Sequence, residues 1–171
     1  GTAMLVVDNK NSADEMLIYL PALKKTRRIV TSEKGKSFMS SEFSNADMSS
    51  PAVSDFTHRH LENSGKGNQW IIESTPANAE KADEYGFSRK VNYVTMDKNQ
   101  VQRMEFYNFD NELFKVVEIK SFFPLSDGKY MVRNMVANNL NTNRKSEILF
   151  SNISEGVKVE DYNFTIQNLE R

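Results

Sequence analysis

The chain has 171 residues, 39% of them hydrophobic and 26% charged, which is long enough for one domain with a core and an internal cavity. Its 22 basic and 23 acidic residues give a net charge of −1, and this balance argues against nucleic acid or an anionic membrane as a partner. There is no cysteine, which excludes disulfides, thiol catalysis and cysteine metal sites, and no apolar run approaches the roughly 20 residues of a membrane-spanning helix.

The first thirty residues predict three β-strands. Residues 2–8 and 15–20 are expected to form a hairpin around the turn-forming residues 9–12, and residues 25–31 form a third strand of alternating character. The run from Met16 to Leu20 has no polar side, so it should be covered on both faces.

The next twenty residues, 31–50, are rich in serine and polar groups, and we call them the lid segment. They carry four large apolar side chains, Phe38, Met39, Phe43 and Met48. A loop of this length inside a compact domain is usually functional or disordered, and these apolar side chains argue against disorder. Residues 45–48 are expected to form one helical turn. The pattern therefore predicts a lid over an apolar site.

The remainder of the chain is mostly strand. One helix is predicted over residues 78–85, because Pro76 precedes it and Gly86 follows it. Strands are predicted over residues 55–63, 69–73, 88–96, 101–109, 113–123, 129–138 and 144–153. The turns between them are short and polar, so consecutive strands should pair in antiparallel fashion.

One of these strands shows how the sheet is covered. Residues 101–109 place Met104 and Phe106 on one face and Arg103 and Glu105 on the other. One face can therefore meet a core or a ligand while the other holds charge in water. A meander of about nine strands closes into a barrel, folds into a sandwich or curls around something, and periodicity does not choose among these.

Catalytic chemistry has weak support in the sequence. His58 and His60 are the only histidines, and their i, i+2 spacing on a strand places both on one face, where they could bind a metal or act as a base. Two histidines spaced in this way more often belong to the polar, solvent-facing side of a strand. Ser54 and Asp55 lie just upstream, but no nucleophile-elbow motif surrounds them. We assign no catalytic residue, metal or cofactor, and a lipid hydrolase using His58 or His60 with Ser54 or Asp55 remains an alternative.

A short basic run, Lys24, Lys25, Arg27 and Arg28, allows two interpretations. The arginine pair could bind a lipid phosphate or a carboxylate at the rim of a cavity. Alternatively, one arginine packs under the lid segment and pairs with Glu42 or Asp47.

Several short motifs resemble a known family. Tyr19-Leu20-Pro21-Ala22-Leu23-Lys24-Lys25, Arg27-Arg28-Ile29, Ser37-Phe38-Met39 and Asp47 are similar to the LolA-like superfamily, in its branch of outer-membrane lipoprotein-sorting proteins. The chain departs from that branch in four places: Leu17 stands where tryptophan is common, Ser40 where glycine is, Glu42 where aspartate is, and Asn45 where an aromatic residue is frequent.

The resemblance implies a mainly β (α+β) fold. It consists of a curled antiparallel sheet that forms an incomplete β-barrel, with its concave face covered by a short helix and a long loop. Residues 1–171 would be a single LolA-like domain. In a longer protein, a helix, the first strands and an export signal would precede it.

The resemblance also implies a function. The protein would be a periplasmic carrier that shelters the acyl chains of lipoproteins or other lipids on their way to the outer membrane, between an inner-membrane transporter and an outer-membrane acceptor. A non-transporting lipid- or protein-binding module of the cell envelope is the alternative. The expected acyl-chain contacts are Leu17, Tyr19, Phe38, Met39, Phe43, Met48, Met104 and Phe106, and the expected head-group or lid-anchoring residues are Arg27, Arg28 and Asp47.

Overall fold

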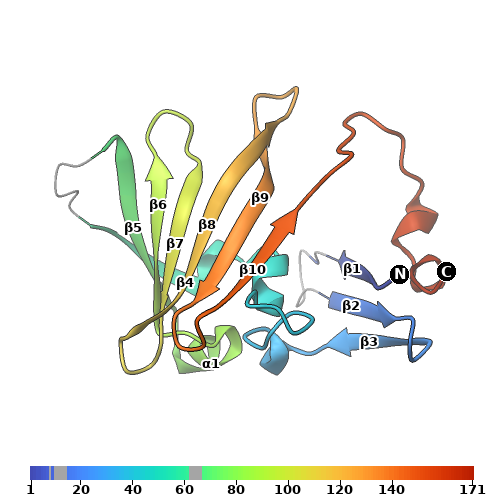
Figure 1. Cartoon of the computed structure of the whole chain (residues 1–171), viewed down its shortest axis with the longest axis horizontal. Helices are drawn as coiled ribbons and strands as arrows, with labels where there is room; N and C mark the ends of the chain where they lie inside the picture. Colours follow the sequence, from blue (N-terminus) through green and yellow to red (C-terminus); the bar gives the residue numbers. More distant parts are fainter. Residues whose placement is uncertain (8, 10–14, 62–66) are drawn as a thin grey trace.

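The structure, a computed structural model, describes residues 1–7, 9, 15–61 and 67–171, which form two antiparallel sheets (Figure 1). The smaller sheet contains β1 (Ala3–Val7), β2 (Glu15–Leu20) and β3 (Lys25–Ile29), in that order. The larger sheet has seven strands in chain order: β4 (Phe56–Leu61), β5 (Gln69–Pro76), β6 (Arg89–Thr95), β7 (Val101–Tyr107), β8 (Leu113–Pro124), β9 (Tyr130–Asn139) and β10 (Arg144–Leu149).

The helical segments are short. They are the 3₁₀ helices η1 (Thr31–Glu33), η2 (Asn45–Met48), η3 (Val53–Asp55) and η4 (Asp161–Phe164), and the α-helices α1 (Ala79–Tyr85) and α2 (Ile166–Leu169). The predicted helix 78–85 is confirmed as α1: the Asn78 side chain caps its start by accepting a hydrogen bond from Lys81 N at 2.9 Å. Gly86 ends it with a left-handed φ of 75°. Among the described helices, none has the length and apolar character needed to span a bilayer.

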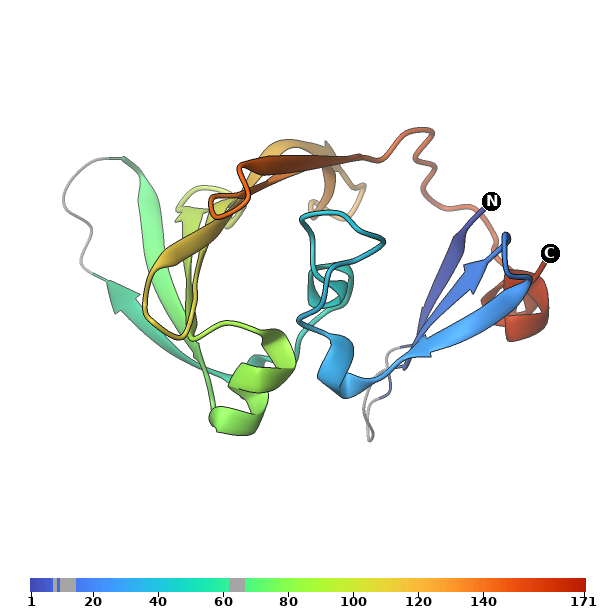
Figure 2. The ribbon, with the colours of Figure 1, turned by 60° about the horizontal axis from the view of Figure 1, so that its bottom comes forward.

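Each predicted strand has a counterpart in the described residues, and the curled, incomplete barrel is confirmed. The strand ends predicted at residue 8 and at residues 62–63 lie outside the described residues. Figure 2 shows the larger sheet curving around the lid segment, with the smaller sheet on the opposite side of that segment. The strand predicted over 144–153 ends early, at Leu149, because the chain leaves the sheet there and runs toward β1. The predicted turn at 9–12 lies, apart from Asn9, outside the described residues.

The curled sheet is not continuous, which the sequence did not predict. In the described residues β3 pairs only with β2, and β4 pairs only with β5, so the chain crosses between the sheets through the lid segment. The lid segment is therefore the connection between the two sheets as well as the cover of the larger one.

The two faces of the larger sheet follow the alternation seen in the sequence. On the concave face, Met104 and Phe106 of β7 belong to or pack against the main core cluster. On the convex face, Arg103 Nε donates to Glu105 Oε1 at 3.0 Å. The prediction for this strand is thus confirmed.

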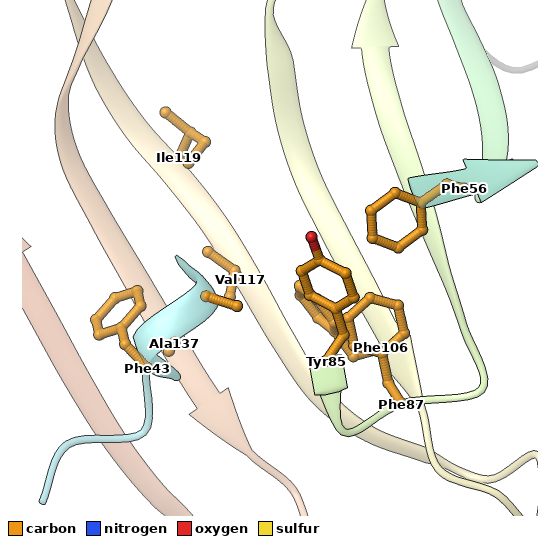
Figure 3. Packing of buried hydrophobic residues seen from close by; sticks show 9 residues of the cluster. Phe43, Phe56, Tyr85, Phe87, Phe106, Val117, Ile119 and Ala137 are labelled. Atoms are coloured by element: carbon orange, nitrogen blue, oxygen red, sulfur yellow. The ribbon is translucent and has the colours of Figure 1, made fainter. Parts of the chain in front are cut away.

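The core has two separate parts. The main cluster lies on the concave face and consists of Phe43, Ala46, Phe56, Tyr85, Phe87, Phe106, Val117, Ile119 and Ala137 (Figure 3). The second cluster contains Leu5, Leu17 and Leu169, so α2 at the chain's end packs against the smaller sheet. A hydrogen bond of 2.6 Å from Thr26 Oγ1 to Glu170 Oε1 adds to this contact.

Candidate ligand-binding site

The lid segment folds on itself before it contacts the sheet. Phe38 N donates to Phe43 O at 2.8 Å, and the hydroxyl of Ser41 donates to Phe38 O at 2.7 Å. Ser37 and Ser44 form an isolated antiparallel bridge at the open end of this small loop. The serines therefore satisfy backbone groups that would otherwise need water, which allows a loop to enter an apolar site.

The helical turn predicted at residues 45–48 is confirmed as η2. Ser44 N donates to Asp47 Oδ2 at 2.7 Å, and Asp47 N donates to Ser44 Oγ at 3.3 Å. This reciprocal arrangement is a capping box, which fixes the start of a helix. The turn places Ala46 in the main core cluster and directs the Asp47 carboxylate toward the larger sheet.

Phe43 is the residue of the lid segment that enters the sheet most deeply. Only 1% of its surface is exposed, and Figure 3 shows its ring beside Val117 of β8 and Ala137 of β9. Phe38 and Met48 pack against the same cluster from outside it. The lid segment thus packs its own apolar side chains against the concave face.

A small cavity remains beside Phe43. Its volume is about 150 Å³, and its walls include Phe56, Phe87, Met104 and Phe106, together with the polar residues Asp47 and Lys90. Ligand pockets for small organic molecules usually measure roughly 300–1,000 Å³. The space left by the docked lid segment is therefore too small for a long acyl chain, and a larger ligand would have to displace Phe43.

One ion pair attaches the lid segment to the floor of the concave face. Lys115 Nζ of β8 lies 2.7 Å from Asp47 Oδ2, and the two side chains are only 8% and 14% exposed. The same ammonium stands 4.2 Å from the centroid of the Phe106 ring. Because both partners are largely removed from water, loss of either one leaves a buried charge without its partner.

A second attachment joins the lid segment to the edge of the sheet. Glu42 Oε1 pairs with Arg144 Nε at 3.0 Å, and Glu42 Oε2 accepts from Asn139 Nδ2 at 2.8 Å. Glu42 N donates to the hydroxyl of Ser146 at 3.0 Å. These contacts hold the loop on β9 and β10, next to the point where Phe43 enters.

A third attachment is made to α1 by close backbone packing. A Cβ placed on Gly35 would lie 2.9 Å from the backbone of Tyr85 and Gly86, so only glycine fits there without a shift. Lys34 Nζ pairs with Glu84 Oε1 at 2.5 Å beside this contact. The lid segment therefore crosses directly over the C-terminal end of α1.

Lys90 of β6 is the second ammonium on the concave face. Its Nζ lies 4.8 Å from the centroid of the Phe56 ring, and no described residue forms a hydrogen bond or an ion pair with its side chain. Burial and the nearby charge of Lys115 lower the pKa of Lys90, although Asp47 acts in the opposite direction. Among the described residues, Asp47 is thus the acidic side chain that lines the cavity with Lys90, and it pairs with Lys115.

Six of the predicted site residues come together here. Those at the concave face are Phe38, Phe43, Asp47, Met48, Met104 and Phe106. Met39 lies instead on the outside of the loop, 51% exposed, and lines a separate groove of about 190 Å³ between the lid segment and the smaller sheet. Whether any of these residues contacts a ligand remains a prediction.

Leu17 and Tyr19 are not at the concave face. They belong to the cluster around Leu5 and Leu169, on the face of β2 that α2 covers. Ile18 and Leu20, which have the opposite side-chain parity, line the groove beside the lid segment. In a run that is apolar on both sides, the sequence does not indicate which face meets the lid.

The two arginines also pair differently from the expectation. Arg27 forms an ion pair with Glu33, and Arg28 pairs with Glu15 at 2.8 Å. Both arginine side chains are more than half exposed, whereas Glu42 and Asp47 are taken by Arg144 and Lys115. The expected pairing of an arginine with Glu42 or Asp47 is therefore wrong. Arg27 instead contacts the lid segment through Glu33, and head-group binding by Arg27 or Arg28 remains a prediction.

Lys90 and Lys115 are the site residues that sequence reasoning missed. Both sit on strands of mixed character, where a lysine usually indicates a solvent-facing position. Lys115 nevertheless shares its parity with Val117 and Ile119, which lie in the core. This shared face was the sequence signal that Lys115 points toward the core.

The histidines do not assemble a catalytic site with the residues just upstream. His58 Nδ1 lies 3.0 Å from Ser74 Oγ, a buried hydroxyl that also accepts from Asn92 Nδ2 at 3.2 Å. Asp55 instead accepts from Tyr85 OH at 2.6 Å and pairs with Lys81 at 3.2 Å. The described residues contain no cluster of metal-binding side chains.

Asp55 shows how its partners outweigh burial. Burial raises the pKa of Asp55, but hydrogen bonds from Tyr85 and Lys81 and the charge of Lys81 lower it more strongly. The pKa therefore lies below the usual value of 3.8, and the carboxylate is charged near neutral pH. It acts as a connection between α1 and the start of β4.

Known structures share this architecture. A domain from Vibrio parahaemolyticus named for outer-membrane lipoprotein sorting superposes with a TM-score of 0.86 at 26% identity, over 99% of this chain and 72% of that one. A DUF1329 family protein from Desulfovibrio piger gives 0.84 at 29% identity, over 99% and 71% of the two chains. A LolA superfamily protein from Nitrosomonas europaea gives 0.67 at 14% identity, over 97% and 71%, which is a likeness of fold.

Sequence comparison adds the family. No curated protein matches the chain. A family model described as "Uncharacterized protein" matches residues 1–171. The chain therefore belongs to that family, and its fold is that of the LolA-like superfamily.

Proposed function

We propose that the protein binds the acyl chains of a lipid or a lipid-modified protein on the concave face of its larger sheet, after the lid segment has left it. The observation that carries this proposal is the position of Phe43. A side chain from an otherwise polar loop is 1% exposed and occupies the middle of an apolar, curved surface. The surface behind it is thus built from Phe, Met and Val side chains that a hydrocarbon ligand could contact in its place.

The energetics favour an exchange of this kind. Exposed acyl chains cost about 0.8 kcal/mol per methylene in water, so a lipid crossing an aqueous space needs a sheltered surface. The lid segment covers that surface when no ligand is present, and a bound chain would replace the contacts of Phe43, Phe38 and Met48. Since one set of apolar contacts replaces another, the net affinity stays modest and release remains possible.

The relatives support a place of action. A similar domain carries outer-membrane lipoprotein sorting in its name, and this supports a role for our chain in the periplasm. Under this proposal an inner-membrane transporter loads the protein and an outer-membrane acceptor unloads it. A fluorescent lipid moving between two vesicle populations tests delivery: faster transfer with the protein supports a carrier, and binding without faster transfer indicates a non-transporting binding module.

Locking the lid segment tests the binding step directly. The chain has no cysteine, so Glu42→Cys with Ser146→Cys introduces one unique pair where Glu42 N lies 3.0 Å from Ser146 Oγ. Joined by oxidation, or by a short bifunctional thiol reagent, the locked protein should not bind a dansyl-labelled undecanoic acid, and reduction of the disulfide should restore binding.

The cysteine-free parent provides the control, since the oxidant cannot cross-link it. Full binding by the locked protein would show that the concave face beneath the lid segment is not the site. No binding by the parent protein would overturn the proposed function itself. Mass spectrometry of lipids that accompany protein purified without detergent gives independent information on the natural ligand.

A further inference from the structure

The concave face carries more positive charge than an acyl-chain surface needs. Lys90, Phe106 and Lys115 lie in one row across β6, β7 and β8, because Lys90 pairs in register with Phe106 and Phe106 with Lys115. Neighbouring strands are about 4.8 Å apart, so the two lysine Cα atoms are separated by roughly 10 Å. Both ammonium groups can therefore reach one small group above the Phe106 ring.

The two lysines differ in what balances their charge. Lys115 has the Asp47 carboxylate at 2.7 Å, whereas Lys90 stands over the Phe56 ring and has no acidic partner among the described residues. Asp47 belongs to the lid segment. When that segment moves away, it removes the only carboxylate that faces this pair within the described part of the chain, and two cations remain on an apolar surface.

The lid segment itself indicates what could take its place. Toward the cavity it presents one carboxylate, Asp47, together with the hydrocarbon of Phe43 and Ala46. An oxyanion attached to an alkyl chain likewise combines one negative charge with hydrocarbon. A neutral lipid would replace the hydrocarbon but would leave both ammonium groups without a counter-charge, which is unfavourable in a site of low polarity.

We propose that the site is selective for an anionic amphiphile, whose single oxyanion binds between Lys90 and Lys115 in place of the Asp47 carboxylate. This inference rests on the proposed function and specifies its ligand class. The oxyanion is a carboxylate or a phosphate, and both satisfy the same two ammonium groups. Burial and the charge of Lys115 lower the pKa of Lys90, and a bound oxyanion would act in the opposite direction, as Asp47 does.

The first test needs no variant. Dansyl-undecanoic acid and its methyl ester carry the same hydrocarbon and differ in one charge, and both are titrated against the parent protein near neutral pH. We expect the acid to bind about tenfold more tightly or better, as one hydrogen bond to a charged group would give. Equal affinities for acid and ester would overturn this inference and leave the proposed function standing, whereas failure of both to bind would remove the proposed function.

Variants then assign the selectivity to the lysines. Lys90→Met keeps the length and apolar stem of the side chain and should lower the ratio of acid to ester affinity, although Lys115 remains, whereas Lys90→Arg should keep the ratio. Lys145→Met makes the same charge change on the convex face and should leave the ratio unaltered. A ratio that is unchanged in Lys90→Met would exclude Lys90 as the head-group partner.

Competition distinguishes the two sources of the oxyanion. Dodecanoic acid and dodecyl phosphate displace the probe in separate titrations, and the stronger competitor identifies a carboxylate or a phosphate head group. Inorganic phosphate at the same concentration should not displace the probe, because it lacks the hydrocarbon. Displacement by inorganic phosphate as effective as that by dodecyl phosphate would show an anion site independent of the acyl surface, contrary to this inference.

Discussion

The two faces of the larger sheet are stabilised in different ways. On the convex face Glu73 has its partners on the sheet itself, because it pairs with Arg59 at 2.8 Å and with Arg89 at 3.5 Å. On the concave face Lys115 depends on Asp47, which comes from the lid segment. The Glu73 cluster therefore needs no other part of the chain, whereas the charge of Lys115 is balanced by a segment that could be exchanged for a ligand.

The largest effect is expected when the deepest contact of the concave face is removed. Phe43→Ala should lower the free energy of lid docking by about 3–5 kcal/mol, because it deletes a buried ring and leaves a cavity. Hydrogen exchange should become faster at the amides of residues 38–47 and change little in β7 and β8. The exposed Phe109 provides the control, and Phe109→Ala should leave exchange unaltered. Equally faster hydrogen exchange in Phe43→Ala and Phe109→Ala would show that Phe43 does not hold the lid segment on the sheet.

Breaking the ion pair beneath the lid segment should have a slightly smaller effect. Lys115→Met leaves the Asp47 carboxylate largely buried without its partner and should cost about 3 kcal/mol, as measured by urea unfolding. Adding Asp47→Leu to the same chain should recover most of this loss, since two apolar side chains then meet. Purely additive losses in the double variant would show that the two residues are not coupled.

The contact with α1 offers a purely steric change. Gly35→Ala places a Cβ 2.9 Å from backbone atoms of Tyr85 and Gly86, which cannot move aside as a side chain would. Overpacking of this kind costs about 1–3 kcal/mol, measured by thermal or urea unfolding. Lys36→Ala, one residue along the lid segment and exposed, should cost far less. A Gly35→Ala protein of parental stability would show that the lid segment does not depend on this close approach.

Acid should weaken the connection between α1 and β4. Because the folded-state pKa of Asp55 is lowered, its stabilising contribution is fully present above the unfolded value of 3.8 and is lost as the pH falls through the folded value. Asp55→Asn should therefore lower stability by about 1.5 kcal/mol near neutral pH, the order of one hydrogen bond to a charged group. The difference in unfolding free energy between Asp55→Asn and the parent protein should become smaller below pH 3.8. A constant difference across this range would argue against the carboxylate as the cause.

The smallest effect is expected on the convex face. Arg103 pairs with Glu105 at 2.9 Å and with Glu118 at 3.4 Å, but its side chain is 38% exposed. Arg103→Ala should cost less than about 1 kcal/mol in urea unfolding, and added salt should reduce the difference further. A loss as large as that of Lys115→Met would remove the contrast between the two faces.

The sequence predicted the elements well because their signals are local. Side-chain alternation located the strands, the residues flanking 78–85 located α1, and Ser44 with Asp47 makes η2 a capped turn. Long-range pairing has no such signal. The break between β3 and β4, and the partners of Arg27 and Arg28, depend on residues that are distant in sequence and were therefore not predicted.

The site was predicted where an apolar residue stood in polar surroundings. Phe43 was recognised for this reason, because only burial explains a phenylalanine among serines. Lys90 and Lys115 are polar residues on strands that also carry apolar side chains. Because these strands alternate imperfectly, the sequence does not show which face of the sheet each lysine occupies. Leu17 and Tyr19 were expected at the cavity from the resemblance. Both faces of β2 are apolar, so the alternation of side chains could not test this expectation, and only the position of α2 decides between the faces.

A single oxygen atom, Asp47 Oδ2, accepts hydrogen bonds from Ser44 N and from Lys115 Nζ, each at 2.7 Å. The bond that closes the turn and the bond that fastens it to the sheet therefore share one acceptor. Formation of the turn and its attachment should reinforce each other, so a partly detached conformation has little to stabilise it. Access to the hydrocarbon surface would then be cooperative and all-or-none, with a rate set by one concerted release.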